Sequence, residues 1–277
     1  MKTILIIADQ SPESEHAAAF ALMIAQAGHA DVLIAGIVKS NSISSAGSVI
    51  AAGQGSEPPE ETQFYVRERL QTTIDPAGAY IPLITEMDVS DYQLADLIAM
   101  VNLNHIWLMV GGMPDSLSRD AEDLKLNIQS VLNRVGCPLL LVPQSWVLKI
   151  PERIVYLADL RYCRQLVLKF LGELAAPFGA GISIAHLSAK GLTDIVDSYA
   201  TTIFQNDILP YAHYDKMNLN NIKERDLHKA LDVIINGMHT DLMVLVNHRY
   251  HFEELIGMYI GDVLPADITI PVLIFPI

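Results

Sequence analysis

Two aspartates stand directly after short apolar runs, Asp9 after residues 4–8 and Asp159 after residues 154–158. Such runs are typical of buried parallel strands, and open α/β sheets bind their ligands at the carboxyl ends of those strands. A carboxylate at that point could accept hydrogen bonds from a ribose or a base. It could equally cap the helix that follows, and the sequence leaves both interpretations open.

The most metal-like cluster of the chain consists of His248, His251, Glu253 and Glu254. On a helix, His-x-x-His spacing brings two imidazoles to one face, where a carboxylate could complete a zinc site. The same residues also suit an exposed polar loop, in which Arg249 could bind an anion. No HExxH order is present, and we therefore expect no metal.

The only cysteines, Cys137 and Cys163, form neither a CxxC pair nor a disulfide framework. Cys137 stands at the start of an apolar run and is expected to be a core thiol. Cys163 opens a helix, whose N-terminus could lower the pKa of the thiol and allow redox chemistry.

The formal net charge of the 277 residues is −14, with 51% hydrophobic and 18% charged residues. An acidic surface repels phosphate backbones and anionic lipids, so we expect no binding to nucleic acid or membranes. The apolar run at the start is too short for a secretory signal, and no run reaches the roughly 18 residues of a membrane span. These observations favour a cytoplasmic protein with apolar residues enough for two cores.

Apolar strands alternate with helices along the first half of the chain. After residues 4–8, Ser11 and Pro12 supply a helix N-cap and a proline that suits the first helical turn, and Gly28 is expected to follow the last turn as the C′ residue, which is commonly left-handed. Alternation of this kind predicts a doubly wound parallel sheet with helices on both faces. Further strands are expected at 31–38, 79–87, 105–110 and 138–142, and a long loop at 39–59.

The same series then restarts. Three later runs repeat earlier ones in the same order: 154–159 repeats 4–9, 242–246 repeats 106–110, and 271–276 repeats 138–143. We therefore predict an α/β fold of two tandem, doubly wound, five-stranded parallel sheets. The domains are expected at residues 1–144 and 151–277, with a linker at 145–150.

These residues resemble the universal stress protein family. Its first strand ends in an Asp before a Ser-rich helix start, as in Ala8-Asp9-Gln10-Ser11-Pro12, and its last strand carries Cys-Pro, an aliphatic run and Pro, as in residues 137–143. The resemblance covers nearly the whole chain as two copies, and fused pairs are a known form of the family. It implies the fold of the adenine-nucleotide α-hydrolase-like proteins.

ATP-binding members carry a glycine motif after the fourth strand: Gly, two residues, Gly, nine residues, Gly, then Ser or Thr. On this chain the motif begins at Gly111, but its later positions fall on Pro114, which has no N–H, and on Leu124 and Lys125. Acidic residues between them oppose a triphosphate. We expect no cofactor, and in particular no ATP. The resemblance leaves a remnant ligand cleft at Asp9, Val38, Gly111, Gly112, Asp159 and Asn247.

The sequence thus favours a non-enzymatic stress-response protein that acts by association with a protein partner of unknown identity. The alternative is a small-ligand or adenine-nucleotide sensor that binds through a non-standard site. Family members dimerise through their last strands, so the resemblance implies that residues 138–142 and 271–275 pair the two halves as an internal pseudo-dimer. A homodimer of the whole chain is compatible with the same apolar edges.

Overall fold

The computed structural model of the chain describes residues 1–9, 11–36, 65–74, 80–115, 128–187, 194–224 and 226–277. Its strands are β1 Lys2–Ala8, β2 Ala30–Gly36, β3 Ile84–Asp88, β4 Leu108–Met113, β5 Leu139–Pro143, β6 Arg153–Leu157, β7 Gly181–Leu187, β8 Met217–Ile222, β9 Leu242–Val246 and β10 Val272–Phe275. Its α-helices are α1 Pro12–Gly28, α2 Tyr65–Thr73, α3 Leu94–Leu103, α4 Ile128–Leu132, α5 Gln165–Ala175, α6 Asp197–Ile203, α7 Leu209–Ala212, α8 Leu227–Asp232 and α9 Tyr250–Leu255.

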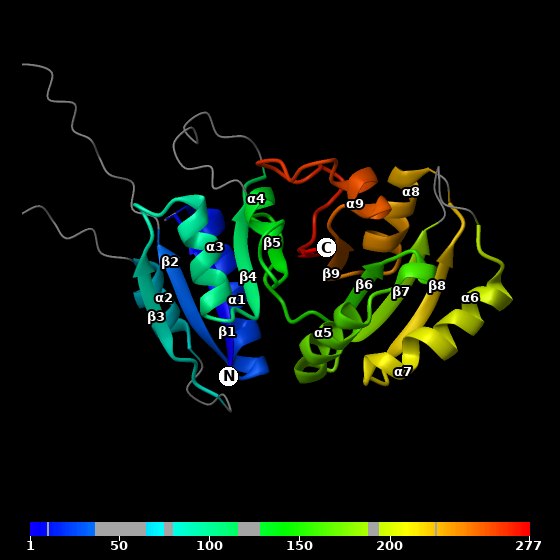
Figure 1. Ribbon diagram of the computed structural model, residues 1–277, viewed down its shortest axis with the longest axis horizontal. Coiled ribbons are helices and arrows are strands. Elements are labelled where there is room, and N and C mark those ends of the chain that lie inside the picture. The colour runs from blue at the N-terminus through cyan, green and yellow to red at the C-terminus, as the bar shows by residue number, and fades with distance from the viewer. Residues whose placement is uncertain (10, 37–64, 75–79, 116–127, 188–193, 225) are drawn as a thin grey trace, which may run out of the picture.

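All of these strands belong to one ten-stranded sheet, in the order β3-β2-β1-β4-β5-β10-β9-β6-β7-β8. Strands β1–β5 are parallel to one another, and so are β6–β10. The two halves meet where β5 and β10 pair antiparallel, with Leu140 opposite Leu273. The predicted fold class of two doubly wound parallel sheets is confirmed, and the sheets are joined edge to edge. Figure 1 shows the C-terminal strand in the middle of the molecule.

Helices cover both faces of each half because the strand order reverses direction after β3 and again after β8. In the first half α1 packs against α2, while α3 packs against α4 on the other face (Figure 1). In the second half α5 packs against α7, and α9 packs on β9. None of the described helices combines the length and the apolar character that crossing a membrane requires.

Histidine occupies every non-glycine position of positive φ in the described part of the chain: His29, His105, His213, His239 and His248. Four of them lie between the end of a helix and the next strand. The prediction that Gly28 provides the left-handed residue after α1 is wrong. Gly28 is the last helical residue, and His29 takes the left-handed conformation, with φ 52° and ψ 51°.

Side chains from both halves pack around the β5–β10 junction. The ring of Trp107, which precedes β4, stacks on Phe170 of α5 at 4.6 Å between centroids, and Phe170 meets Phe275 edge-on at 5.2 Å. Lys2 of the first half places its ammonium 4.4 Å from the Trp107 ring centre and 3.1 Å from the Glu173 carboxylate of the second half. The halves are therefore held by an aromatic stack and an ion pair as well as by the strand ladder.

A buried carboxylate fixes the chain where the second half begins. Asp241, which precedes β9 and is 4% exposed, accepts hydrogen bonds of 2.9 Å from the backbone N–H groups of both Glu152 and Arg153. Its second oxygen forms an ion pair with the ammonium of Lys149. Asp241 therefore holds the start of β6 beside β9.

Several boundaries differ from the predicted ones. β4 begins at Leu108 and continues through both glycines to Met113, so Gly111 and Gly112 belong to the strand itself. β3 begins at Ile84 rather than at residue 79, and residues 75–79 lie outside the described ranges. The end of the predicted strand at 31–38 and the predicted loop at 39–59 lie outside them too.

Candidate functional site

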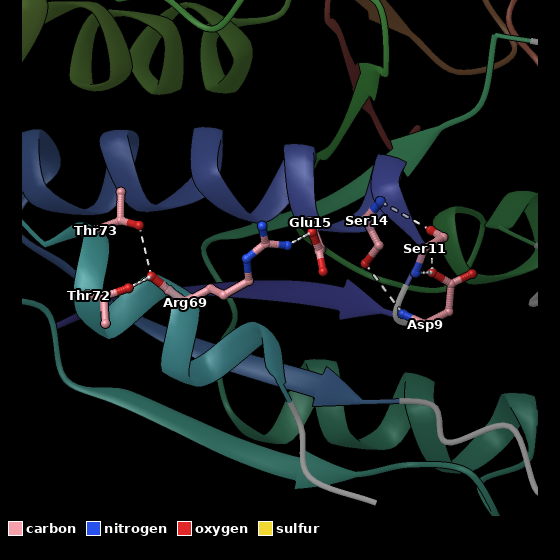
Figure 2. Close-up of polar contacts among 7 residues, drawn as sticks. All are labelled: Asp9, Ser11, Ser14, Glu15, Arg69, Thr72 and Thr73. Atoms are coloured by element: carbon pink, nitrogen blue, oxygen red, sulfur yellow. Dashed lines mark hydrogen bonds and ion pairs between the residues drawn. The ribbon is translucent and has the colours of Figure 1, made fainter.

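The carboxylate of Asp9, at the end of β1, is bound to the start of α1. Its Oδ1 accepts hydrogen bonds from the backbone N–H of Ser11 at 3.2 Å and from the Ser11 hydroxyl at 2.6 Å, as Figure 2 shows. Ser11 in turn caps α1 by accepting a hydrogen bond from the N–H of Ser14 at 3.2 Å. Of the two interpretations of Asp9, the structure supports helix capping, because a ligand would have to compete for that oxygen.

The second glycine of the pair in β4 lies against the backbone of α1. A Cβ atom built on Gly112 would stand 2.2 Å from the carbonyl oxygen of Glu13 and 2.7 Å from the nitrogen of Ser14. A Cβ on Gly111 would meet only a Leu141 methyl group at 4.0 Å. Gly112 is therefore required for the close packing of the first turn of α1 on β4, and this role involves no phosphate.

Some of the other residues considered for nucleotide binding lie outside the described ranges. This applies to Val38, to Leu124 and Lys125, and to the acids between residues 116 and 124. Asp115 is described, and its Oδ1 accepts hydrogen bonds from the N–H and the hydroxyl of Ser145, at 3.2 and 2.8 Å.

Asn247 follows β9 at the point that corresponds to Gly111, and it faces the other half of the molecule. Its side-chain oxygen accepts a hydrogen bond from Nε2 of Gln129 at 2.9 Å, and its nitrogen donates to Oδ1 of Asn133 at 2.8 Å. Gln129 also accepts from the backbone N–H of Ile260, at 3.3 Å. The structure therefore does not bring Asn247 together with Asp159 in a cleft. Asn247 contributes to a polar contact between the halves.

The two histidines of the metal-like cluster contact different parts of the molecule. His248 lies 3.2 Å from Oδ1 of Asn133 in the first half, whereas His251 is buried, with its Nε2 3.2 Å from the carbonyl oxygen of Leu187. The interpretation of this segment as an exposed polar loop is wrong for His251, because Tyr250–Leu255 form helix α9 and bury its ring. Within the described ranges no three His, Cys, Asp or Glu side chains gather as metal ligands would.

Asp159 lies on the wall of a cavity of about 210 Å³ in the second half. The cavity opens at the carboxyl ends of β6 and β9, which are neighbours in the sheet. At this point the strand order changes direction, because the chain continues from β6 to β7 on one side and from β9 to β10 on the other. Open α/β sheets characteristically bind their ligands at such a switch point. Polar lining is supplied by Asp159, Tyr162, Arg164, Arg249, Tyr250 and His251.

Arg161 neutralises the carboxylate in this wall. Its Nε lies 2.9 Å from Oδ1 of Asp159 and its Nη2 lies 2.7 Å from Oδ2, which is a bidentate pair. Burial raises the pKa of Asp159, but the hydrogen bonds and the charge of Arg161 outweigh burial, so that its pKa lies below the ordinary value. Asp159 is therefore ionised and paired at neutral pH.

His251 contributes no charge to the cavity at neutral pH. Burial lowers its pKa to about 4, against a smaller opposite effect of the hydrogen bond to Leu187. Because Nε2 faces a carbonyl oxygen, Nε2 carries the proton and Nδ1 is left as an acceptor.

The two remaining arginines of the wall differ in their contacts. Arg164 donates from one Nη to the carbonyl oxygen of Pro276 at 3.0 Å, which leaves its other N–H groups available. Arg249 is exposed at the mouth, and its guanidinium has no hydrogen-bond or ionic partner in the part of the chain that the structure describes. From the sequence, Arg249 was one alternative for anion binding, and Arg164 was not predicted. The available signal was the Asp-x-Arg-x-x-Arg spacing after the first strand of the second half.

Neither cysteine is activated. Burial raises the pKa of Cys137 and of Cys163 to about 12 each. The expectation that the helix start could lower the pKa of Cys163 is wrong, because burial of that thiol raises its pKa by more than the hydrogen bonds with Tyr156 and the Arg164 backbone lower it. Cys137 is the predicted core thiol.

A second hollow, of about 340 Å³, lies between α1 and α2 and away from the strand ends. Its charged lining residues, Glu15 and Arg69, form an ion pair with each other (Figure 2). No predicted site residue lines it. The cavity at β6 and β9 is therefore the stronger candidate for a binding site.

No protein-family model matches the chain, and no curated protein matches it in sequence. Solved structures do match. A universal stress protein from Archaeoglobus fulgidus DSM 4304 superposes with a TM-score of 0.58 at 10% identity, over 99% of this chain and 97% of that one. A functionally unknown protein from Pseudomonas aeruginosa PAO1 gives a TM-score of 0.54 at 12% identity, over 99% and 92%. A Pseudomonas aeruginosa UCBPP-PA14 protein, provisionally assigned as a universal stress protein, gives 0.52 at 11% identity, over 99% and 93%. Over nearly its whole length the chain therefore has the fold of the universal stress proteins in their tandem form.

Proposed function

We propose that this protein is a non-enzymatic stress-response protein of the universal stress protein type, which acts by association and does not bind ATP. The observation that carries the proposal is the contact between Gly112 and the backbone of Glu13. The resemblance would assign Gly112 to a nucleotide cleft, but this glycine packs against the first turn of α1. The Asp9 carboxylate beside it accepts hydrogen bonds from Ser11, the residue that caps the same helix.

Two further observations support a non-catalytic role. Both thiols have a raised pKa and are therefore protonated at neutral pH, which makes them poor nucleophiles. The second half has Asn247 in place of the first motif glycine, and this side chain is committed to Gln129 and Asn133.

Association begins, in this proposal, with the halves themselves, which form an internal pseudo-dimer. The palindromic strand order and the antiparallel β5–β10 pairing support this interpretation. Because each half covers the apolar edge of the other, external partners would bind elsewhere on the surface.

The test is the thermal stability of the protein with Mg-ATP at millimolar concentration, against the same ionic strength of salt. A ligand at 100 times its dissociation constant stabilises a protein by about 2.7 kcal/mol, which corresponds to roughly 5–10 °C here. We expect no shift beyond that of the salt, and no release of phosphate above the blank. A saturable shift of several degrees, or phosphate release, would contradict the proposal.

A second function, small-ligand sensing, is favoured by one specific observation. The cavity at the ends of β6 and β9 lies at the switch point of the sheet and presents an unpartnered guanidinium, in the described part of the chain, from Arg249. Its ligand would be bound without any glycine motif. Retention of a small molecule through purification, identified by mass spectrometry, would support this function.

A further inference from the structure

The cavity of the second half has a positive wall in an acidic protein. The chain carries a formal charge of −14, yet Arg161, Arg164 and Arg249 gather around one small opening. Among the described residues, Asp159 is the only carboxylate that lines the cavity, and it is bound to Arg161. Glu254 lies near Tyr250 but does not line the cavity. The guanidinium groups of Arg164 and Arg249 therefore remain for a ligand, and their charge favours an anion.

The rest of the lining is apolar or aromatic. Leu157, Ala158 and Val246 come from the strand ends, and Tyr162 and Tyr250 from the segments that follow β6 and β9. Such a surface desolvates a hydrocarbon or aromatic body and holds its polar group at the mouth. His251 is neutral at pH 7 and does not oppose this arrangement.

The volume limits the size of the ligand. Pockets for drug-sized molecules measure roughly 300–1,000 Å³, whereas this cavity measures about 210 Å³. A nucleotide, with base, ribose and phosphates, does not fit within it. A small acid with a single ring or a short branched chain does.

We propose that this cavity binds a small aromatic or branched carboxylate, with Arg249 as the main ligand of the carboxylate group. The proposal rests on the sensing function described above and names the ligand class of that site. A single uncommitted guanidinium matches a planar carboxylate in one bidentate contact, and Arg164 supplies a second donor from inside. Phosphate could use the same donors, so the comparison of benzoate with phenyl phosphate tests the choice of a carboxylate.

The experiment measures thermal stability and binding heat of the full chain with benzoate, phenyl phosphate and inorganic phosphate, at pH 7 and constant ionic strength. We expect a saturable shift with benzoate that exceeds those of both phosphates. Arg249→Gln should weaken benzoate binding by about tenfold or more, and Arg67→Gln, on the exposed face of α2, should leave it unchanged. Arg249 is exposed and its guanidinium has no partner among the residues that the structure describes, so we expect its replacement to leave folding intact.

Each result decides between the alternatives. Equal benzoate binding by wild type and Arg249→Gln would overturn the assignment of Arg249. Stronger binding of phenyl phosphate than of benzoate would overturn the carboxylate class and leave a sensor of phosphate esters. No saturable shift with any of the three probes would overturn the carboxylate proposal, whereas the sensing function is decided separately by whether a small molecule is retained through purification. A shift with Mg-ATP that Arg249→Gln does not change would contradict the association proposal alone.

Discussion

The side-chain nitrogen of Gln129 donates a 2.9 Å hydrogen bond to the side-chain oxygen of Asn247, and the two residues are 4% and 0% exposed. One belongs to α4 of the first half and the other follows β9 of the second. The bond is therefore a buried polar link between the two halves. Such a link favours one relative position, because a shifted arrangement would leave the buried oxygen of Asn247 without its donor.

We expect Gln129→Ala and Asn247→Ala each to lower the free energy of unfolding by about 1–3 kcal/mol, because each removes a buried hydrogen bond and leaves one polar atom of the remaining amide without that partner. The double variant should lose less than the sum of the two, with a coupling of about 1 kcal/mol. Urea unfolding measures all four proteins. Asn236→Ala, which removes an exposed amide bonded to Asp232, is the control and should cost little. Strict additivity would show that the contact does not stabilise the folded chain.

Gly112 and Gly111 provide a matched pair of substitutions in one strand. Gly112→Ala should destabilise the protein by about 3 kcal/mol or more, since the obstacle is the α1 backbone and cannot move as a side chain would. Gly111→Ala, with its nearest neighbour at 4.0 Å, should change stability by less than about 1 kcal/mol. Similar unfolding midpoints for the two variants would contradict the packing role of Gly112.

The stability of the protein should fall between pH 6.5 and pH 4 through His251. Its folded-state pKa is about 4, below the ordinary histidine value of 6.5 that we take for the unfolded chain. In this window the unfolded state binds the proton and the folded state does not, so stability is full above pH 6.5 and is lost as the pH falls. Between pH 7 and pH 5 we expect wild type to lose about 1–2 kcal/mol more than His251→Gln.

The comparison with His251→Gln isolates this histidine from the carboxylates. Asp159, whose pKa is lowered, contributes mainly below pH 4. The glutamine retains an N–H donor for the carbonyl of Leu187 but does not titrate. Parallel pH profiles for the two proteins would show that His251 is not buried in the neutral form.

Replacing left-handed histidines by glycine should stabilise the protein. His105 and His213 are exposed and have φ of 49° and 50°. A non-glycine residue in this conformation costs about 1–2 kcal/mol, part of which the entropy of glycine offsets. We expect a gain of about 0.5 kcal/mol for each variant in urea unfolding. Lys169→Gly, in the middle of α5, should instead cost about 1 kcal/mol. A loss in all three variants would contradict the backbone argument.

The two side chains of the Asp241–Lys149 ion pair differ in burial: that of Asp241 is buried and that of Lys149 is exposed. Asp241→Ala should lower the free energy of unfolding by about 2–4 kcal/mol, because two backbone N–H groups lose their acceptor at a buried position. Lys149→Ala should cost less than about 1 kcal/mol, because the ammonium is 54% exposed. Thermal unfolding of both variants distinguishes the two effects. Equal losses would assign the stabilisation to the ion pair.

The repeated fold could be predicted because parallel strands and capped helices are encoded locally. Residues 4–9 and 154–159 carry the same strand-and-acid pattern, and both form central strands of their halves. Ser11 and Pro12 predicted the start of α1, which the structure confirms. The end of α1 could not be located as well, because both Gly28 and His29 can adopt the left-handed conformation.

The candidate site was less predictable because it depends on contacts between distant segments. Arg164 and Arg249 are far apart in the chain and meet only when β6 and β9 become neighbours. The role of Gly112 depends on how closely α1 approaches β4, a distance that periodicity does not encode. Asn247 was assigned to a cleft by analogy with a motif, whereas its neighbours are set by the junction between the halves.

The β5–β10 ladder also has a consequence for biosynthesis. β5 is made early, but its partner β10 is the last strand of the series, so the whole second half must leave the ribosome before that edge is covered. Until then Leu139–Pro143 has one apolar strand edge without a partner. Pairing of this edge with β5 of another nascent chain would lead to domain-swapped or aggregated species. Synthesis of this protein therefore includes an interval in which the β5 edge is exposed to such pairing.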